Sequence, residues 1–354
     1  MPVFIAILIA MLYNLSTSVE HLSISLIRET SEEVNLQVNS RFESVTSMLK
    51  STGNWKYESP EEILNPEELN NLYIPMLKFS DQVSSMMIAT ADGSEYMLLE
   101  LDGYWSNRIT RSDADGLSSV RYRWEYDPRS EDILLERWRD TSGYDPRTRI
   151  WFQGALQQKA PQQIFWTPPY TFFTTREPGI TISMYSFTRR GDTLVTAYDL
   201  LLKDINRITQ SLELTPNGLA LILTAEDFRA VGLPATERFM QQDTAEAYIL
   251  SKVKDLDIPV LTASIEHWES IDRTTGPHEL KYKRESWWAG YYPVVSETGQ
   301  TILYIALLVP ESDFLSEMNR TRLVILFGFI LVLTLTILVI RAYSQVYKAN
   351  RLLE

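Results

Sequence analysis

The sequence predicts an α+β protein in which a long N-terminal stalk helix carries two tandem antiparallel-sheet modules, flanked by two transmembrane helices. Three observations support this: an apolar segment near each end, an amphipathic stripe after the first, and short apolar runs separated by turn residues in between. The chain has 354 residues, more than one typical domain, and 45% of them are hydrophobic. At least two modules with sizeable cores are therefore expected.

The apolar segments predict the two membrane spans. Residues 323–340 run for 18 residues without a charge, which is the length and composition of a transmembrane helix, placed at residues 322–341. Residues 2–15 are also apolar but short, and no lysine or arginine precedes them. We therefore assign residues 1–18 to a first transmembrane helix that is truncated at its cytoplasmic end.

Basic residues favour a cytoplasmic carboxyl end. Arg341, Lys348 and Arg351 follow the second apolar segment, whereas only two basic residues immediately precede it. Residues from about 19 to 320 would then lie outside the bilayer, and residues 342–354 would form a cytoplasmic helical linker.

Residues 19–50 predict the stalk helix. Apolar side chains recur there mostly at steps of three or four, which is the spacing of one helical face. The stripe consists of Val19, Leu22, Leu26, Val34, Val38, Phe42, Val45 and Leu49. It packs either against the chain's own modules or in a dimer seam.

Two groups of short strands follow the stalk. In the first module, residues 51–202, a sheet of about five or six strands is expected. Its apolar runs are residues 84–89, 95–101, 121–126, 133–139, 164–170, 180–187 and 192–198. The second module, residues 203–318, opens with a helical pattern and continues with strands. These are expected at residues 219–224, 260–265, 280–284, 287–295 and 301–309.

The composition excludes several classes of function. The net charge is -13 and the pI is near 4.9, so the chain offers no basic surface for nucleic acid. It contains no cysteine, which removes disulfides and thiolate chemistry. His21, His267 and His278 have no metal-ligand spacing, and neither a phosphate-binding glycine loop nor a nucleophile elbow is present. We therefore predict no catalytic residues, no metal and no cofactor.

Residues 143–152 combine groups that can hold a small polar molecule. A turn begun by Asp-Pro is surrounded by one tyrosine, two arginines, one tryptophan and one phenylalanine. Arg149 offers a rigid fork suited to a carboxylate, and aromatic walls would strengthen that pair. In the alternative interpretation, an arginine here pairs with Asp145 or Asp199, and Trp151 and Phe152 are core residues.

The order of elements resembles the double Cache sensor domain of bacterial transmembrane receptors, a family of chemoreceptors, sensor kinases and cyclases. The motifs that carry the resemblance are DPRTRIWFQGA at residues 145–155, WTPPY at 166–170, the strand ending at Asp199, WWAGYYP at 287–293 and VPESDF at 309–314. It implies two PAS-like modules, of which the membrane-distal one holds a small-molecule ligand. It also implies the lipid bilayer of the bacterial inner membrane, a homodimer through the stalk, and a cytoplasmic output domain or partner outside this chain.

The resemblance also implies the residues of the ligand pocket. Carried over from the amino-acid-binding version of the family, they are Tyr144, Arg149, Trp151, Phe152, Tyr170 and Asp199. Arg149 would bind the ligand carboxylate. That version has an aspartate for the ligand ammonium group two positions after the aromatic pair, and this position is Gly154 here. The expected ligand is therefore a small polar metabolite, either a carboxylate or an amino-acid-like molecule.

These observations predict a sensor that relays ligand binding through the second transmembrane helix. Two alternatives remain: a structural membrane-anchored module with a degenerate pocket, or the sensor part of a truncated cyclase or kinase. A cavity beside Arg149 would distinguish the sensor from the degenerate module.

Overall fold

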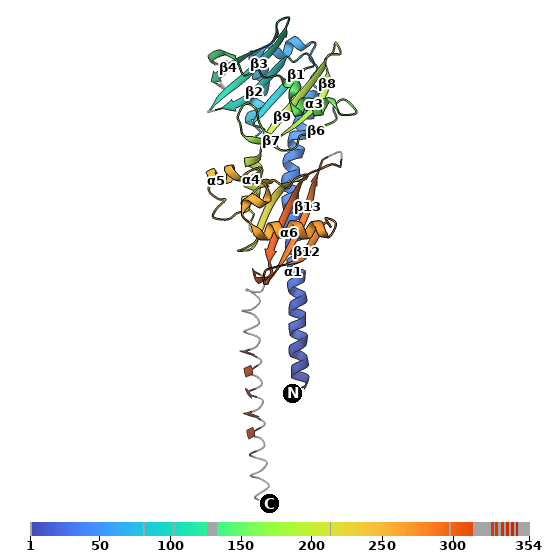
Figure 1. Ribbon diagram of the computed structural model, residues 1–354, viewed down its shortest axis with the longest axis vertical. Coiled ribbons are helices and arrows are strands. Elements are labelled where there is room, and N and C mark those ends of the chain that lie inside the picture. Colours follow the sequence, from blue (N-terminus) through green and yellow to red (C-terminus); the bar gives the residue numbers. More distant parts are fainter. Residues whose placement is uncertain are drawn as a thin grey trace, which may run out of the picture.

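The computed structural model shows an elongated molecule built along one long helix (Figure 1). It describes residues 2–80, 82–101, 103–125, 133–212, 214–296 and 299–313, together with scattered positions between 327 and 345. Two antiparallel sheets follow one another along this helix, and the first sheet lies farther from the N-terminus (Figure 1). The predicted mixture of helices and antiparallel sheets is confirmed.

The long helix, α1, extends from Pro2 to Gly53 and packs against strands of both sheets. The upper part of the predicted stripe is buried, from Val34 to Leu49. Lower down, Ile27 is fully buried in place of the expected Leu26. Ile27, Ser31 and Val34 continue the alternating steps of four and three that keep one face toward the sheets, and Leu26 falls outside this spacing.

The first sheet has nine strands in the order β5-β4-β3-β2-β1-β9-β8-β6, with β7 paired to β8. The strands are β1 Ser85–Thr90, β2 Glu95–Leu101, β3 Tyr104–Asp113, β4 Gly116–Glu125, β5 Ile133–Asp140, β6 Phe165–Trp166, β7 Tyr170–Thr171, β8 Pro178–Phe187 and β9 Thr193–Leu201. The short helices η1 (Pro60–Leu64) and α2 (Pro66–Lys78) precede them. The helices η2 (Pro146–Thr148) and α3 (Ile150–Leu156) lie between β5 and β6.

The two faces of this sheet have different partners. Successive side chains of a strand point to opposite faces. Met86 and Ile88 of β1 join the core with α1 and α2, whereas Met87 and Ala89 pack with α3. On β9, Val195 and Ala197 also face α3. Asp199 continues this series, so the backbone alternation directs its carboxyl group to the α3 side.

The second sheet has five strands in the order β11-β10-β14-β13-β12. They are β10 Leu219–Thr224, β11 Ala230–Gly232, β12 Gly276–Tyr282, β13 Glu285–Val295 and β14 Thr301–Pro310. The accompanying helices are α4 Leu202–Gln210, α5 Gln242–Tyr248, η3 Val253–Leu256 and α6 Pro259–Ser270. Since β9 ends at Leu201 and α4 begins at Leu202, no residue separates the last strand of the first sheet from α4.

The strand predicted at residues 260–265 is wrong, because these residues belong to α6. Its buried residues follow helical spacing and include Val260, Leu261, Ser264, Ile265 and Trp268. A run of six residues is too short to separate the helical period from the strand period. Pro259 at the start of the helix is the signal that indicates a helix.

The first sheet is also larger than the five or six strands expected. No strand is predicted from the sequence at β3, which buries Asn107 and Arg108 next to each other. Two adjacent buried polar residues break the alternation of apolar and polar positions by which a half-buried strand is recognised.

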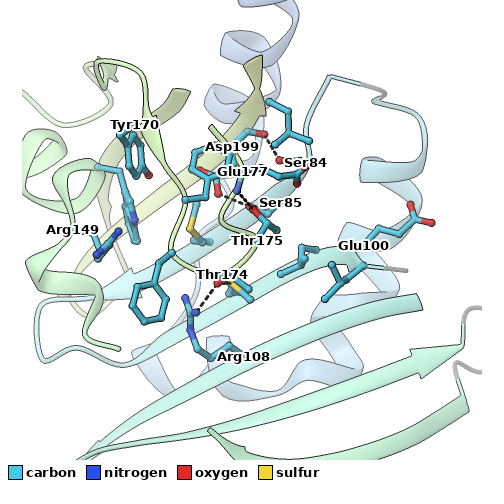
Figure 2. A pocket seen from close by; sticks show the side chains of 18 of the residues that line it. Ser84, Ser85, Glu100, Arg108, Arg149, Tyr170, Thr174, Thr175, Glu177 and Asp199 are labelled. Carbon is cyan, nitrogen blue, oxygen red and sulfur yellow. Dashed lines mark hydrogen bonds between the residues drawn. The ribbon is translucent and has the colours of Figure 1, made fainter. Parts of the chain in front are cut away.

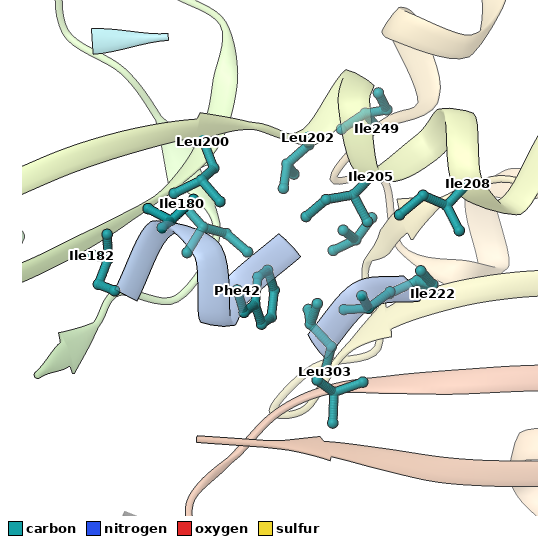
Figure 3. Close-up of a cluster of buried hydrophobic side chains, with 14 of the residues drawn as sticks. Phe42, Ile180, Ile182, Leu200, Leu202, Ile205, Ile208, Ile222, Ile249 and Leu303 are labelled. Carbon is teal, nitrogen blue, oxygen red and sulfur yellow. The ribbon is translucent and has the colours of Figure 1, made fainter. Parts of the chain in front are cut away.

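The hydrophobic core is continuous between the two sheets (Figure 3). Ile180, Ile182 and Leu200 come from the first sheet, Phe42 from α1, Leu202, Ile205 and Ile208 from α4, and Ile222 and Leu303 from the second sheet. The first two turns of α4 therefore fill the space between the sheets.

The segments expected at residues 322–341 and 342–354 lie largely outside the described residues. Residues 2–18 of the first expected span form the beginning of α1. In the part of the chain that the structure describes, no helix combines the length and the apolar composition needed to cross a membrane.

Candidate functional site

A cavity of about 130 Å³ lies on the α3 side of the first sheet (Figure 2). Strands β1, β2, β3 and β9 form its floor, the η2–α3 segment forms one wall, and the loop of residues 172–177 forms another. Its volume is far above the roughly 10–15 Å³ that admits one water. Five of the six residues predicted to bind ligand line it, namely Tyr144, Arg149, Trp151, Tyr170 and Asp199.

The turn that Asp145 begins brings Arg149 to the cavity. Asp145 Oδ1 accepts a hydrogen bond of 2.9 Å from the backbone amide of Arg147, whose side chain folds back onto the same carboxylate with an Nη2–Oδ2 distance of 2.8 Å. Arg149 follows in an extended conformation at the N-cap of α3. Among the described residues, no carboxylate lies within ion-pair distance of its guanidinium. Arg147, and not Arg149, is thus the arginine that pairs with Asp145.

Two aromatic rings hold the Arg149 guanidinium at the cavity wall. Its Cζ atom lies 5.7 Å from the ring centroid of Tyr144 and 5.4 Å from that of Phe173. Arg108 lies over the Tyr144 ring at 3.4 Å from the centroid. Cation–π attraction leaves the N–H donors of Arg149 available for an anion. Burial raises the pKa of Tyr144 well above its usual value, so the phenol keeps its proton.

Asp199 is a buried acid whose two oxygens each accept a hydroxyl hydrogen bond. Ser85 Oγ donates to Oδ2 at 2.6 Å, and Thr181 Oγ1 donates to Oδ1 at 2.5 Å. Burial raises the pKa of Asp199 to about 6, against the opposing effects of these hydrogen bonds and of the Arg108 charge. The carboxylate is thus mostly ionised at neutral pH, and no cation among the described residues lies within ion-pair distance of it.

Tyr170 extends the hydrogen-bonded chain from Asp199. Its hydroxyl lies 2.7 Å from Thr181 Oγ1. The one hydroxyl proton of Thr181 goes to Asp199, so Tyr170 must be the donor to Thr181. Burial raises the pKa of Tyr170, which keeps this proton in place.

A buried ion pair between Arg108 and Glu95 lies at the cavity floor. The Nε–Oε2 distance is 2.9 Å and the Nη2–Oε1 distance is 3.2 Å, with side chains 1% and 0% exposed. In the β2–β3 register Met97 lies opposite Arg108, and Glu95 lies opposite Thr110, so the two charges are diagonal neighbours on one face. Because the pair is neutral, Arg108 adds little net charge to the cavity.

A second ion pair lies at the rim of the cavity. Lys203 Nζ is 2.7 Å from Glu177 Oε1, and each side chain is 38% exposed. Lys203 belongs to the first turn of α4, whereas Glu177 ends the loop of residues 172–177. The rim therefore joins two segments that are distant in the sequence.

Phe152 and Gly154 lie outside the lining of the cavity. Phe152 is 3% exposed and packs with Trp151 in the cluster between α3 and the sheet. At Gly154, an added Cβ would lie 2.0 Å from Cε1 of Phe165. The aspartate that the amino-acid-binding family carries at this position has no space here, because the Phe165 ring occupies it.

The two residues that hold Asp199 are not among those predicted from the sequence. Ser85 of β1 and Thr181 of β8 lie directly opposite Asp199 in the two strand registers. They are 114 and 18 residues away from it in the chain. The only indication in the sequence is a hydroxyl residue on a largely apolar strand. It points to Ser85 and Thr181 only once the strand order is known.

Two histidines without metal-ligand spacing in the sequence lie together in the second module. The rings of His267 on α6 and His278 on β12 have centroids 5.4 Å apart. Among the described residues, however, no group of three or more histidine, aspartate or glutamate side chains could hold a metal ion.

The long helix, the two antiparallel sheets along it and the charged cavity on the first sheet define a class of tandem-sheet domain. The ligand-binding domain of the Pseudomonas fluorescens chemoreceptor CtaA, in complex with L-isoleucine, matches with a TM-score of 0.50 and 14% identity. The match covers 85% of this chain and 98% of that domain. The ligand-binding domain of the Campylobacter jejuni chemoreceptor Tlp3, in complex with 4-methylisoleucine, matches with a TM-score of 0.51 and 13% identity over 83% of this chain and 91% of that domain.

These chemoreceptor domains are Cache-type sensor domains, so the structural matches confirm the fold that the sequence motifs imply. No protein-family model matches the chain. Adenylate cyclase 1 of Rhizobium meliloti (strain 1021) is 28% identical over 234 residues, which are 62% of this chain and 33% of the cyclase. The chain thus spans about a third of the length of this curated relative.

Proposed function

We propose that this chain is the ligand-sensing region of a bacterial inner-membrane receptor and that its first module binds a small zwitterionic metabolite such as an amino acid. The observation that carries the proposal is a pair of opposite charges, Arg149 and Asp199, that line the cavity without an ion-pair partner in the described part of the chain, whereas Glu100, which also lines it without one, is exposed to solvent. Arg108 pairs with Glu95, and Lys203 pairs with Glu177. Among the described residues, Arg149 and Asp199 have no such partner.

A zwitterion satisfies both charges at once. A charge in a partly desolvated cavity is unfavourable unless an opposite charge approaches it. The Arg149 fork suits a carboxylate, and Asp199 suits an ammonium group. A carboxylate without an amine would leave Asp199 unpaired, and an amine without a carboxylate would leave Arg149 unpaired. Asp199 takes the role that the aspartate at the position of Gly154 has in the related pockets.

The cavity favours a sensor over a structural module with a degenerate pocket. A degenerate pocket would be filled by its own side chains, whereas here about 130 Å³ remain open beside Arg149. Chemoreceptor domains of the same fold hold L-isoleucine and 4-methylisoleucine. These ligands guide the choice of test compounds.

In the proposed receptor, residues 1–18 and 322–341 cross the inner membrane, and residues from about 19 to 320 lie outside. Residues 51–202 form the membrane-distal module and residues 203–318 the proximal one. Two chains dimerise through the stalk, and ligand binding shifts a pre-existing equilibrium of the second span toward one state. Residues 342–354 lead to a cytoplasmic output domain or partner. The 28% identity to an adenylate cyclase favours a cyclase as one such output.

The test is calorimetric titration of the purified full chain with the L-amino acids, supported by thermal unfolding. At one hundred times its dissociation constant, a ligand should add about 2.7 kcal/mol to the free energy of unfolding. Each amino acid that binds is then compared with its des-amino acid and its decarboxylated amine, and both should bind far more weakly.

Three variants locate the site. Arg149→Gln and Asp199→Asn should each weaken binding by roughly 10- to 150-fold, the worth of a hydrogen bond to a charged group. Arg147→Gln is the matched control, because Arg147 lies in the same turn, pairs with Asp145 and does not line the cavity. The proposal fails if no zwitterion binds, or if Arg147→Gln weakens binding as much as Arg149→Gln.

A further inference from the structure

The loop of residues 172–177, here called the lid, is a compact turn over the cavity (Figure 2). It connects β7 to β8, and five of its residues line the cavity. The backbone amide of Phe172 donates to the carbonyl of Glu177 at 2.8 Å, and that of Arg176 donates to the carbonyl of Phe172 at 3.2 Å. Arg176 adopts the left-handed conformation with a φ of 62° that closes the turn. These bonds make the lid a unit that can move as a whole.

The lid is attached both to the cavity floor and to α4. On the floor, Thr174 Oγ1 accepts a hydrogen bond of 3.0 Å from Arg108 Nη1. On the other side, Glu177 pairs with Lys203 of α4 at 2.7 Å. Phe172 anchors the base of the lid on Gly179, where an added Cβ would lie 1.9 Å from its Cζ atom. The lid therefore contacts α4, the helix that follows the last strand of the first sheet.

α4 is attached to the second module by its later turns. Asn206 Oδ1 accepts a hydrogen bond of 2.7 Å from the backbone amide of Leu233, which follows β11. Gln210 Nε2 donates to the carbonyl of Phe239 at 2.6 Å. Ile205 and Ile208 are buried in the core between the two sheets (Figure 3). At its first turn α4 therefore pairs with the lid through Lys203, and at its later turns it is hydrogen-bonded to the second module.

We propose that Glu177 and Lys203 are positioning residues that couple two movements. One is the closure of the lid over the cavity, and the other is the packing of α4 against the second module. This inference rests on the proposed function, because the lid closes on a ligand in the cavity. A half-exposed ion pair stabilises the fold little, but it can be exchanged at little cost. That property suits a contact that must shift between two states. The Glu177–Lys203 ion pair, helix α4 and the hydrogen bond between Asn206 and Leu233 form an unbroken path from the lid to the second module.

The first arm of the test uses the full chain without ligand. Hydrogen exchange is followed at the lid amides and at Leu233, whose amide reports directly on α4. Lys203→Glu and Glu177→Lys should each speed exchange about two- to fivefold at both places, as expected for the loss of an exposed ion pair. The charge-exchanged double variant should restore native rates at both. Arg207→Gln is the matched control, since it removes an exposed cation on the same helix that pairs with Asp204.

The second arm adds L-isoleucine as the probe, replaced by any zwitterion that the calorimetry identifies. In the native chain, the probe should slow exchange at the lid and at Leu233. In Lys203→Glu it should slow exchange at the lid alone. The inference is overturned if the single reversals change the lid but leave Leu233 at the native rate. If no zwitterion binds, the proposed function is contradicted. The exchange rates measured without ligand would still show whether the lid and Leu233 are coupled.

Discussion

Asp199→Asn should remove a pH dependence of stability that the native chain has because of this one carboxyl group. Folding raises the pKa of Asp199 from its ordinary value of 3.8 to about 6, because burial disfavours the charged form. Between these values the folded state holds a proton that the unfolded state has released. The free energy of unfolding therefore falls as the pH rises through this range. The stabilisation is complete below pH 3.8 and is lost above a pH of about 6.

The magnitude follows from the two pKa values. Their difference corresponds to roughly 3 kcal/mol, since one pH unit is worth about 1.4 kcal/mol. Asparagine keeps the shape of the side chain but cannot ionise. Relative to the native chain, the variant should therefore gain about 3 kcal/mol between pH 3.5 and pH 8. The substitution also changes the hydrogen bonds with Ser85 and Thr181. This change alters the stability of the variant equally at both pH values, so it cancels in the comparison.

Urea unfolding of both proteins at several pH values measures the effect. Asp145→Asn is the control of opposite sign, because its hydrogen bonds with Arg147 lower the pKa of Asp145. That variant should lose stability relative to the native chain as the pH rises. If the stabilities of the native chain and Asp199→Asn follow parallel curves, the buried carboxyl group does not titrate as argued, and the role of burial at this site is refuted.

Three further predictions concern the surroundings of the cavity. Glu95→Gln should cost about 3–5 kcal/mol because it leaves Arg108 buried without its counter-charge, and Glu95→Gln with Arg108→Met should recover most of this loss in chemical unfolding. Gly154→Ala should destabilise the fold by about 1–3 kcal/mol because its Cβ would meet the Phe165 ring. Adding Phe165→Leu should reduce that cost, and an undiminished cost would place the clash elsewhere. The affinity of a zwitterionic ligand should rise about tenfold per pH unit between pH 4 and pH 6 as Asp199 ionises, whereas calorimetry of the same ligand with Asp199→Asn should show no such rise.

Most of the fold follows from local patterns in the sequence. The stripe from Val34 to Leu49 is predicted because a helix packed on sheets must repeat its buried face every 3.6 residues. β3 is not predictable in this way, since its buried Asn107 and Arg108 are stabilised by partners on α2 and β2 and by no local pattern. At residues 260–265 a local pattern is present but ambiguous, because a short apolar run fits a helix and a strand equally well.

The candidate site, too, can be predicted from the sequence only in part. The segment from Tyr144 to Trp151 is continuous, so its ability to hold an anion can be recognised from the residues themselves. Which arginine remains available cannot, because that depends on the turn at Asp145, which directs Arg147 back onto the carboxylate. Ser85 and Thr181 meet Asp199 only through the strand order of the folded sheet.

The continuous core has a consequence for how the chain unfolds. Phe42, Ile205 and Leu303 belong to one apolar cluster, although they come from the stalk, the connecting helix and the second sheet. Neither sheet can lose its packing without exposing apolar surface of the other, so the two modules form one cooperative unit in thermodynamic terms. A ligand of the kind proposed for the first sheet would then raise the free energy of global unfolding of both sheets together, although it makes no contact with the second.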